Sequence, residues 1–357
     1  MGVTRQIKVG ILTAPHIEFE LRANTFVLKN VRIGIGFHWD RHEDQEFAGS
    51  LEIRNNADGT QTAINTIDLE DYLCSVISSE MNANSPMELL KAHAVISRSW
   101  AIRAMQKPNH EGYDVCADDH CQRYEGLRRM NERAVEAVRA TKGQVLINEK
   151  MVNDQMVNEI CDCRYYKCCG GKTEIWRTCW EDIDVPYIQS VTCDYCDPKR
   201  SSIVNRLIVN SLNDYDQETK DFRDWKVTYT QEELSEIVRT KSGIDFGDII
   251  DLIPLHRGAS GRIDSLKIVG TKRTEIIGKE LKIRLWLSRT CLYSSWFEVE
   301  KSFHFSPFTF HLIGHGWGHG AGLCQIGAAV MASEGHKYEE ILSFYYRGAK
   351  LSQMTKW

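Results

Sequence analysis

Several features that would assign a protein to a familiar class are missing from this sequence of 357 residues. No apolar run approaches the roughly 20 residues that a membrane-spanning helix needs. The formal net charge is −5, so basic residues are not in excess, which argues against a nucleic-acid-binding protein. No internal repeat or low-complexity linker is present. The composition, 42% hydrophobic and 26% charged, is typical of a folded protein with a substantial core.

A secretory signal is also missing. The first residues, MGVTRQIKVGIL, contain no hydrophobic segment followed by a cleavage site. This absence is weak information about location, because an export signal can be removed from a chain.

The order of predicted elements indicates a mixed α+β fold. The first sixty residues alternate apolar and polar side chains, and Gly and Asn-Asn-Ala-Asp-Gly punctuate them as hairpin turns would. Helices and strands then follow without the regular βαβ alternation of a parallel sheet. We therefore expect an N-terminal β-rich region, residues 1–60, followed by a region of mixed helices and antiparallel sheets, residues 61–357.

Two consecutive helices open the second region, over about residues 66–81 and 85–105. Ser85 can cap the second helix, with Pro86 in its first position and Glu88 completing a capping box. A third helix, MNERAVEAVRATKG, has its C-cap at Gly143.

The C-terminal half contains further elements with clear signals. TQEELSEIVRTKSG reads as a capped helix, and RIDSLKIVG with RTEIIG reads as a hairpin. WFEVEKSFHFSPFTFHLIG reads as a strand pair broken at Pro307.

Cysteines are numerous and unevenly placed. Seven of the twelve lie in the segment from Cys161 to Cys196, which includes CDC, CC and CDYC. Such spacing is consistent with disulfides in an exported protein, with metal binding, or with free thiols. The CDYC pair could join with CDC or CC in a second metal site.

A second group of sulfur and imidazole donors lies in HEGYDVCADDHCQRY. His110, Cys116, His120 and Cys121 offer two imidazoles and two thiolates, a composition that a tetrahedral zinc accepts. The spacing matches no standard zinc finger, and a Cys116–Cys121 disulfide or unligated side chains are the alternatives. Four protein ligands would close the site, so the zinc would be structural and would not activate water.

The segment GHGWGHGAG, residues 314–322, contains five glycines and two histidines. A phosphate-binding loop or a metal site is conceivable for such a stretch. The phosphate-binding alternative fails because the strand, Lys-Ser/Thr and helix context of a P-loop is missing.

Glu80 lies in SSEMNANSP, at the end of the first predicted helix. Burial by Met81 and the next helix would raise its pKa and make it a usable general acid. The sequence pattern alone favours an ordinary surface glutamate.

Five blocks in order resemble the SpoIID/LytB family. They are DLEDYLCSVISSEMNANSPMELLKAHAVISRSWAIRAM, DVCADDHCQRYEG, YYKCCGGKTE, PYIQSV and GHGWGHGAGLCQIGAAVMASEGHKYEEILSFYYRGAKL, from about residue 66 to 351. Any one block alone would be weak, but five in the family order are a specific signal. The extra cysteines depart from the family pattern, as does Trp100 in place of a tyrosine.

The resemblance implies a protein that acts on peptidoglycan. Family members include lytic transglycosylases, which cleave glycan strands between N-acetylmuramic acid and N-acetylglucosamine to 1,6-anhydro products. The family's catalytic glutamate corresponds here to Glu80, which would serve as both general acid and general base. Other members are described as enhancers of a cell-wall amidase, so a non-catalytic glycan-binding partner of an amidase is the alternative. A metal-dependent hydrolase is a weaker third possibility, because two thiolates suit a structural zinc better than a catalytic one.

The resemblance also implies a glycan-binding groove lined by CQRY, GGKTE and GHGWGHG, and a zinc near the active site of some members. The residues it places at the groove or the substrate are Arg98, Ser99, Gln122, Tyr124, Gly170, Gly171, Thr173, Trp317, His319 and Gln325. Six of them have a plain structural alternative: a buried ion pair for Arg98, packing for Gln122 and Tyr124, a tight turn for the glycine pair Gly170–Gly171, and a core anchor for Trp317. His319 is the candidate to hydrogen-bond substrate or Glu80. Glu70 and Asp71 are expected to be solvated or capping.

Peptidoglycan lies outside the cytoplasm, so the resemblance implies an extracytoplasmic protein, in the periplasm or cell envelope, whose export signal or lipid anchor has been removed. It does not imply that the source organism sporulates.

Overall fold

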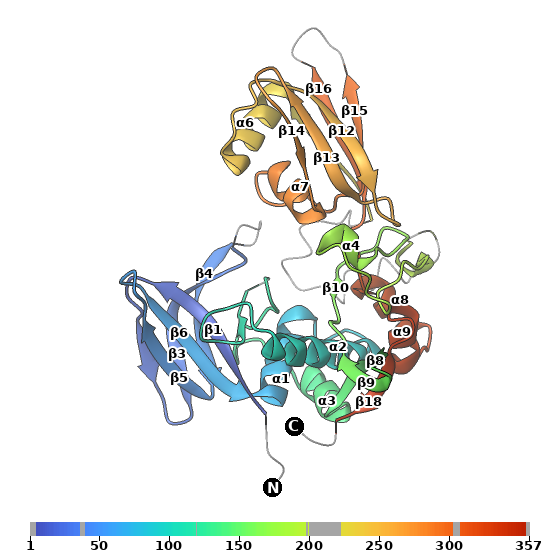
Figure 1. Cartoon of the computed structure of the whole chain (residues 1–357). Helices are drawn as coiled ribbons and strands as arrows, with labels where there is room; N and C mark the ends of the chain where they lie inside the picture. The colour runs from blue at the N-terminus through green and yellow to red at the C-terminus, as the bar shows by residue number, and fades with distance from the viewer. Residues whose placement is uncertain are drawn as a thin grey trace.

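The computed structural model describes residues 5–35, 40–118, 120–197, 199, 223–302 and 308–354. Helices and several antiparallel sheets alternate along the chain, which confirms the predicted α+β class and the β-rich N-terminal region (Figure 1). Two separate hydrophobic cores are present. The smaller core is built only from residues between Trp225 and Leu312, and the larger one from the rest of the described chain.

Two small sheets form the N-terminal region, in the orders β5-β6-β1-β7 and β2-β3-β4. The strands are β1 (Gln6–Ala14), β2 (Phe19–Leu21), β3 (Thr25–Ile33), β4 (Arg41–Ala48), β5 (Ser50–Asn55), β6 (Gln61–Asp68) and β7 (Val115–Cys116). Strand β7 belongs to the His/Cys loop and pairs in parallel with β1, with Val9 opposite Val115. This pairing anchors the loop to the N-terminal sheet.

Three helices follow: α1 (Leu69–Glu80), α2 (Met87–Gln106) and α3 (Glu132–Ala140). Strand β6 runs directly into α1, and the Asp68 side chain caps the helix by accepting from the Glu70 amide. Helix α2 is almost wholly buried from Leu89 to Ile102, so it forms the centre of the larger core.

Two predicted helix ends are wrong. The capping box of Ser85 and Glu88 does not form, because Pro86 is the N-cap and the helix starts one residue later than predicted. The Glu88 carboxylate instead accepts from Lys91 and from the Tyr338 amide. The third helix ends at Ala140 and its C-cap is Thr141, two residues before the predicted cap, Gly143.

The Cys-rich segment and the C-terminal residues pack together beside α2. Their elements are β8 (Gln144–Val152), β9 (Gln155–Ile160), β10 (Tyr165–Tyr166), α4 (Trp176–Cys179), the 3-10 turn η1 (Asp194–Cys196), β17 (Leu323–Cys324), α8 (Gln325–Ser333), α9 (Tyr338–Tyr345) and β18 (Lys350–Gln353). Strand β10 pairs in parallel with β17, which places Tyr165 opposite Leu323. Two family blocks more than 150 residues apart therefore lie side by side.

The smaller core lies in a lobe of its own, at the top of Figure 1. The lobe consists of β11 (Asp224–Thr230), α6 (Gln231–Ser242), β12 (Ile249–Arg257), β13 (Ile263–Gly270), β14 (Thr274–Ile277), α7 (Glu280–Trp286), β15 (Phe297–Ser302) and β16 (Thr309–His315). The predicted hairpin is β13 with β14, and the predicted strand pair is β15 with β16. Pro307, the predicted break between those strands, lies outside the described residues.

The N-terminal cap of helix α6 provides a test of the structure of this lobe. The Thr230 hydroxyl accepts from the Glu233 amide and the Glu233 carboxylate accepts from the Thr230 amide, so Thr230→Ala removes half of a capping box. We expect a loss of about 1 kcal/mol, with Thr230→Ser close to wild type. Hydrogen exchange of the α6 amides measures the effect, and equal protection in Thr230→Ala would contradict it.

Candidate active site and candidate metal centres

Glu80 is the last residue of α1 and is only partly exposed. Its Oε1 accepts a hydrogen bond from the Tyr165 hydroxyl at 3.0 Å and from the Arg123 backbone N–H at 3.2 Å. Tyr165 comes from β10, and Arg123 follows the His/Cys loop. Three segments far apart in the sequence therefore meet at one carboxylate.

Tyr165 was not among the predicted site residues, although it lies in the block YYKCCGGKTE. Burial and the nearby charge of Glu80 raise its pKa well above the ordinary value, so the hydroxyl stays protonated and donates. The His93 ring meets its ring edge-on, with centroids 4.4 Å apart. The only signal in the sequence was the motif itself, because spacing cannot show that a strand residue reaches a helix end.

His93 is the second residue that the sequence did not single out. It is fully buried on α2, where its Nδ1 lies 3.1 Å from the Ser97 hydroxyl and its Nε2 lies 3.1 Å from the Gln325 amide nitrogen. Burial lowers the pKa of His93 to about 3, so the ring is neutral. The Gln325 amide donates to Nε2, and Nδ1–H donates to Ser97. Gln325, predicted to contact substrate, thus binds the histidine beneath Tyr165.

His319 does not contact Glu80, contrary to one of the two roles predicted for it. Its Nδ1 accepts from the Ala321 amide at 3.1 Å, and its Nε2 lies 3.0 Å from the Tyr165 carbonyl oxygen, to which Nε2–H donates. Burial, with the charge of Arg164 as a further cause, lowers its pKa well below the ordinary value. A neutral His319 therefore holds the backbone of the residue that binds Glu80.

Arg98 forms a buried ion pair, the plain alternative for this residue. Its guanidinium binds Glu70 through two hydrogen bonds of 2.7 and 2.8 Å, and it also donates to the backbone carbonyls of Val138 and Gln144. The sequence predicted Glu70 to be solvated or capping. The structure instead makes Glu70 the ion-pair partner of the fully buried Arg98. Ser99 is also buried and accepts from the Leu146 amide, which joins α2 to β8.

Gln122 and Tyr124 are buried as well. The Gln122 amide oxygen accepts from the Tyr72 hydroxyl at 3.2 Å, and the Tyr124 hydroxyl donates to Asn65 at 2.7 Å. Their backbone follows Cys121, so these contacts hold the segment that presents the Arg123 amide to Glu80.

The glycine pair Gly170–Gly171 and Thr173 lie in a tightly packed turn. A Cβ on Gly170 would lie 2.8 Å from the Gly316 nitrogen, so this glycine permits direct backbone contact with the glycine-rich stretch. The Thr173 hydroxyl accepts from the Val191 amide at 2.8 Å, and the residue is 1% exposed.

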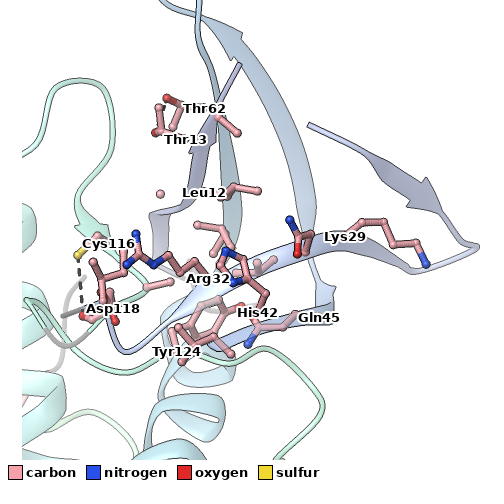
Figure 2. A pocket seen from close by; sticks show the side chains of 18 of the residues that line it. Leu12, Thr13, Lys29, Arg32, His42, Gln45, Thr62, Cys116, Asp118 and Tyr124 are labelled. Carbon is pink, nitrogen blue, oxygen red and sulfur yellow. Dashed lines mark hydrogen bonds between the residues drawn. The ribbon is translucent and has the colours of Figure 1, made fainter. Parts of the chain in front are cut away.

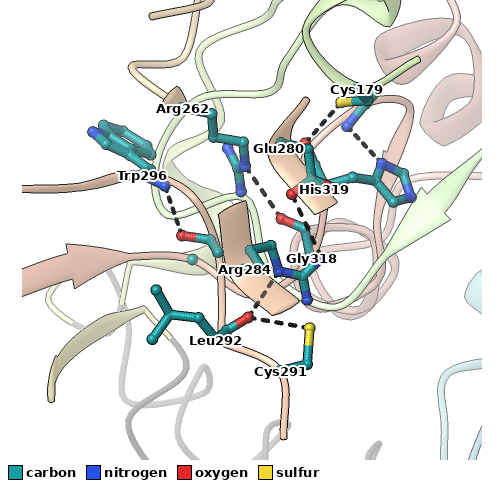
Figure 3. A network of polar contacts seen from close by, with 12 residues as sticks. Cys179, Arg262, Glu280, Arg284, Cys291, Leu292, Trp296, Gly318 and His319 are labelled. Atoms are coloured by element: carbon teal, nitrogen blue, oxygen red, sulfur yellow. Dashed lines mark hydrogen bonds and ion pairs between the residues drawn. The ribbon is translucent and has the colours of Figure 1, made fainter. Parts of the chain in front are cut away.

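The glycine-rich stretch, residues 314–322, runs between the Cys-rich segment and Arg262. A Cβ on Gly320 would lie 2.5 Å from the Arg262 guanidinium, which donates to the Gly318 carbonyl (Figure 3). Trp317 pairs its backbone with Cys168 and is 9% exposed, and its ring meets Tyr293 edge-on. These contacts agree with the core-anchor alternative for Trp317.

The four predicted metal ligands of the His/Cys loop do converge. The ligand atoms of His110, Cys116, His120 and Cys121 all lie within 4.8 Å of one another. A hydrogen bond from the Cys121 thiol and another from His120 lower the pKa of Cys116 to about 4. Two thiols and two imidazoles at this separation suit one tetrahedral ion.

A pocket of about 870 Å³ adjoins this loop and the N-terminal sheets (Figure 2). His110, Cys116, His120 and Tyr124 contribute to its lining. Among the described residues, the lining includes neither Glu80 nor the glycine-rich stretch. This pocket is therefore not the site of the candidate catalytic residue. The groove inferred from the sequence stays a prediction.

No disulfide joins the described cysteines of the Cys161–Cys196 segment. Cys169, Cys193 and Cys196 lie with Cys324 in a second group whose sulfur atoms are within 4.8 Å of one another.

Fold and site together define an α+β protein in which the Glu80 carboxylate is held by hydrogen bonds from Tyr165 and Arg123 and is a candidate general acid and base. Residues 57–148, which include Glu80, match the family model for stage II sporulation protein (SpoIID), which supports the resemblance to the SpoIID/LytB family. A second model, described as a domain of unknown function (DUF8618), matches residues 174–322.

Three similar proteins extend the comparison. An uncharacterized protein of Brachyspira hyodysenteriae is 29% identical over 307 residues, 86% of this chain and 72% of that protein. Stage II sporulation protein D of Bacillus subtilis is 24% identical, over 82% of this chain and 76% of its own length. The amidase enhancer of Bacillus subtilis is 28% identical, over 78% of this chain and 40% of its own length.

Among the described residues, the helices all fall short of the length and apolar character that crossing a membrane requires.

The buried His93 predicts a specific pH dependence. Its pKa falls from an ordinary 6.5 to about 3 in the folded chain, so the unfolded chain binds a proton between these values that the folded chain does not. Stability therefore decreases as pH falls from about 6.5 to 3, by at most about 1.4 kcal/mol per pH unit. In His93→Gln this slope should be smaller, as measured by denaturant unfolding at several pH values.

The exposed His16 supplies the control, because His16→Gln should leave the slope unchanged. Identical slopes for wild type and His93→Gln would contradict the assignment of a neutral buried ring.

Proposed function

We propose that this protein is a lytic transglycosylase of peptidoglycan, with Glu80 as general acid and base. The observation that carries the proposal is the Glu80 carboxylate, partly exposed at the end of α1 and held by the Tyr165 hydroxyl and the Arg123 amide. The match to the stage II sporulation protein (SpoIID) family model supports it, because Glu80 lies within the matched residues 57–148.

One carboxyl group is enough for this reaction. Protonated Glu80 gives its proton to the glycosidic oxygen as the bond to the anomeric carbon of N-acetylmuramic acid breaks. The 6-hydroxyl of the same sugar attacks that carbon, and the Glu80 carboxylate accepts the hydroxyl proton. The product is a 1,6-anhydro sugar, no water is consumed, and Glu80 ends in its starting state.

Tyr165 and Arg123 supply the positioning. Two donors on one oxygen restrict rotation of the carboxyl group, and they stabilise its charge once the proton has left. Tyr165 is in turn fixed by His93 at its ring and by His319 at its carbonyl.

We also propose a structural zinc at His110, Cys116, His120 and Cys121. The donor set suits zinc, and four protein ligands leave no open position. The ion would fix the loop that ends at Arg123, two residues after Cys121, and so fix one of the two donors to Glu80.

The second candidate function is that of a glycan-binding partner of a cell-wall amidase. The similarity to a protein named amidase enhancer favours it. In either case the substrate places the protein outside the cytoplasm, in the periplasm or cell envelope.

Glu80→Gln distinguishes these functions. The amide cannot transfer a proton, so release of 1,6-anhydro-muropeptides from purified peptidoglycan should fall below detection by mass spectrometry. Glu136→Gln, on the exposed face of α3, should retain full release. A wild-type protein that binds glycan strands but releases nothing, and that stimulates an amidase equally well as Glu80→Gln, would overturn the enzymatic proposal.

Tyr165→Phe tests the positioning of Glu80. Loss of a hydrogen bond to a charged group, worth about 1.5–3 kcal/mol, should lower kcat by roughly 10- to 100-fold. Tyr166→Phe is the matched control, because the buried Tyr166 hydroxyl has no hydrogen-bond partner among the described residues. Equal rates for the two variants would contradict the role of Tyr165.

A further inference from the structure

Four buried cysteines from three separate segments converge. Cys169 follows β10, Cys193 is the N-cap of η1 and Cys196 its last residue, and Cys324 is the N-cap of α8. Each is at most 1% exposed. Nothing in the proposed reaction uses these thiols.

The separations fit a single ion. All four sulfur atoms lie within 4.8 Å of one another, and the Cys169 and Cys196 sulfurs are 3.1 Å apart. A tetrahedral ion with metal–sulfur bonds of about 2.3 Å sets its ligands about 3.8 Å apart. Two disulfides would instead sort the four sulfurs into two pairs, and an iron–sulfur cluster spreads its cysteines over several irons.

Backbone amides point at two of these sulfurs. Cys324 Sγ accepts from the Cys169 amide at 3.2 Å and from the Gly327 amide at 3.3 Å, the latter at the start of α8. Cys169 Sγ accepts from the Gly171 amide at 3.4 Å. Such donors stabilise thiolates and orient metal ligands, whereas a disulfide has no charge for them to stabilise.

Gly327 leaves room for the sulfur atoms. A Cβ at this position would lie 2.9 Å from Cys193 Sγ and 3.4 Å from Cys324 Sγ. The Tyr345 hydroxyl lies 3.3 Å from Cys193 Sγ and covers the same side. The surroundings are therefore shaped around the sulfur atoms and leave no path to solvent.

We propose that Cys169, Cys193, Cys196 and Cys324 bind one structural zinc ion, in addition to any ion in the His/Cys loop. The closed set of four thiolates gives the ion no open position, so its role is to join three chain segments. One of these segments begins α8, whose first residue, Gln325, binds His93. The ion would therefore fix the start of α8 and, through Gln325 and His93, the support of the Tyr165 ring.

Metal content measures the proposal directly. The full chain, produced with zinc and freed of loosely bound metal, should contain two zinc ions, as should Cys168→Ser and Cys291→Ser. Cys168 is the sharper control, because its thiol is equally buried and contacts Cys196 and Cys324 but does not belong to the four. Cys193→Ser/Cys196→Ser should contain one ion, and loss of zinc from Cys168→Ser would overturn the ligand set.

X-ray absorption avoids dependence on a variant that fails to fold. In His110→Ala/Cys121→Ala the four-cysteine group is intact, and its one zinc should show four sulfur neighbours at about 2.3 Å. Nitrogen or oxygen neighbours, bound iron, an absence of metal, or disulfides among these cysteines in a non-reduced peptide map would each overturn the proposal. None of these results depends on whether the protein cleaves glycan, so this proposal and the enzymatic one fail separately.

Discussion

The structure depends on the close backbone contact between the glycine-rich stretch, residues 314–322, and the segment that begins at Arg164. A Cβ on Gly322, whose φ is +86°, would lie 2.0 Å from the Arg164 carbonyl oxygen. A side chain here would therefore push the two segments apart and break the parallel pairing of β10 with β17. Because that pairing places Tyr165, it also places a donor on Glu80. The glycines are thus explained by close packing against protein backbone and side chains, and no contact with a ligand is needed to account for them.

The motif residues mainly hold the site in place from the protein interior, and they contribute less to its exposed surface. Arg98, Ser99, Thr173 and Gln325 are all less than 5% exposed, and each has a hydrogen-bond partner in the protein. Burial of a polar group without a hydrogen-bond partner costs free energy. Each of these residues is therefore constrained together with its partner elsewhere in the chain. Five ordered blocks are therefore a strong sign of a shared fold and a weaker guide to which atoms touch a sugar.

Local signals were sufficient for much of the fold. Helix α6 is capped as predicted, and the β13–β14 hairpin forms as the alternation indicated. The predicted start of α2 was wrong because the Glu88 carboxylate binds the Tyr338 amide. This contact spans 250 residues, and no local pattern contains it. The sequence left the ion-pair partner of Arg98 undetermined for the same reason. Glu70 lies on a neighbouring helix, and sequence spacing does not show which carboxylate faces a buried arginine.

The sequence by itself determined the α+β class, the resemblance to a known family, the glutamate at the end of α1 and the donor set of the His/Cys loop. These depend on periodicity, ordered motifs and residues close together along the chain. Only the tertiary structure decided that Tyr165 binds Glu80, that His93 and His319 hold Tyr165, and that Cys324 joins three cysteines of the Cys-rich segment. The reason is physical: hydrogen bonds and metal ligation act over about 3 Å in space, and folding brings together atoms whose residues are far apart in the chain.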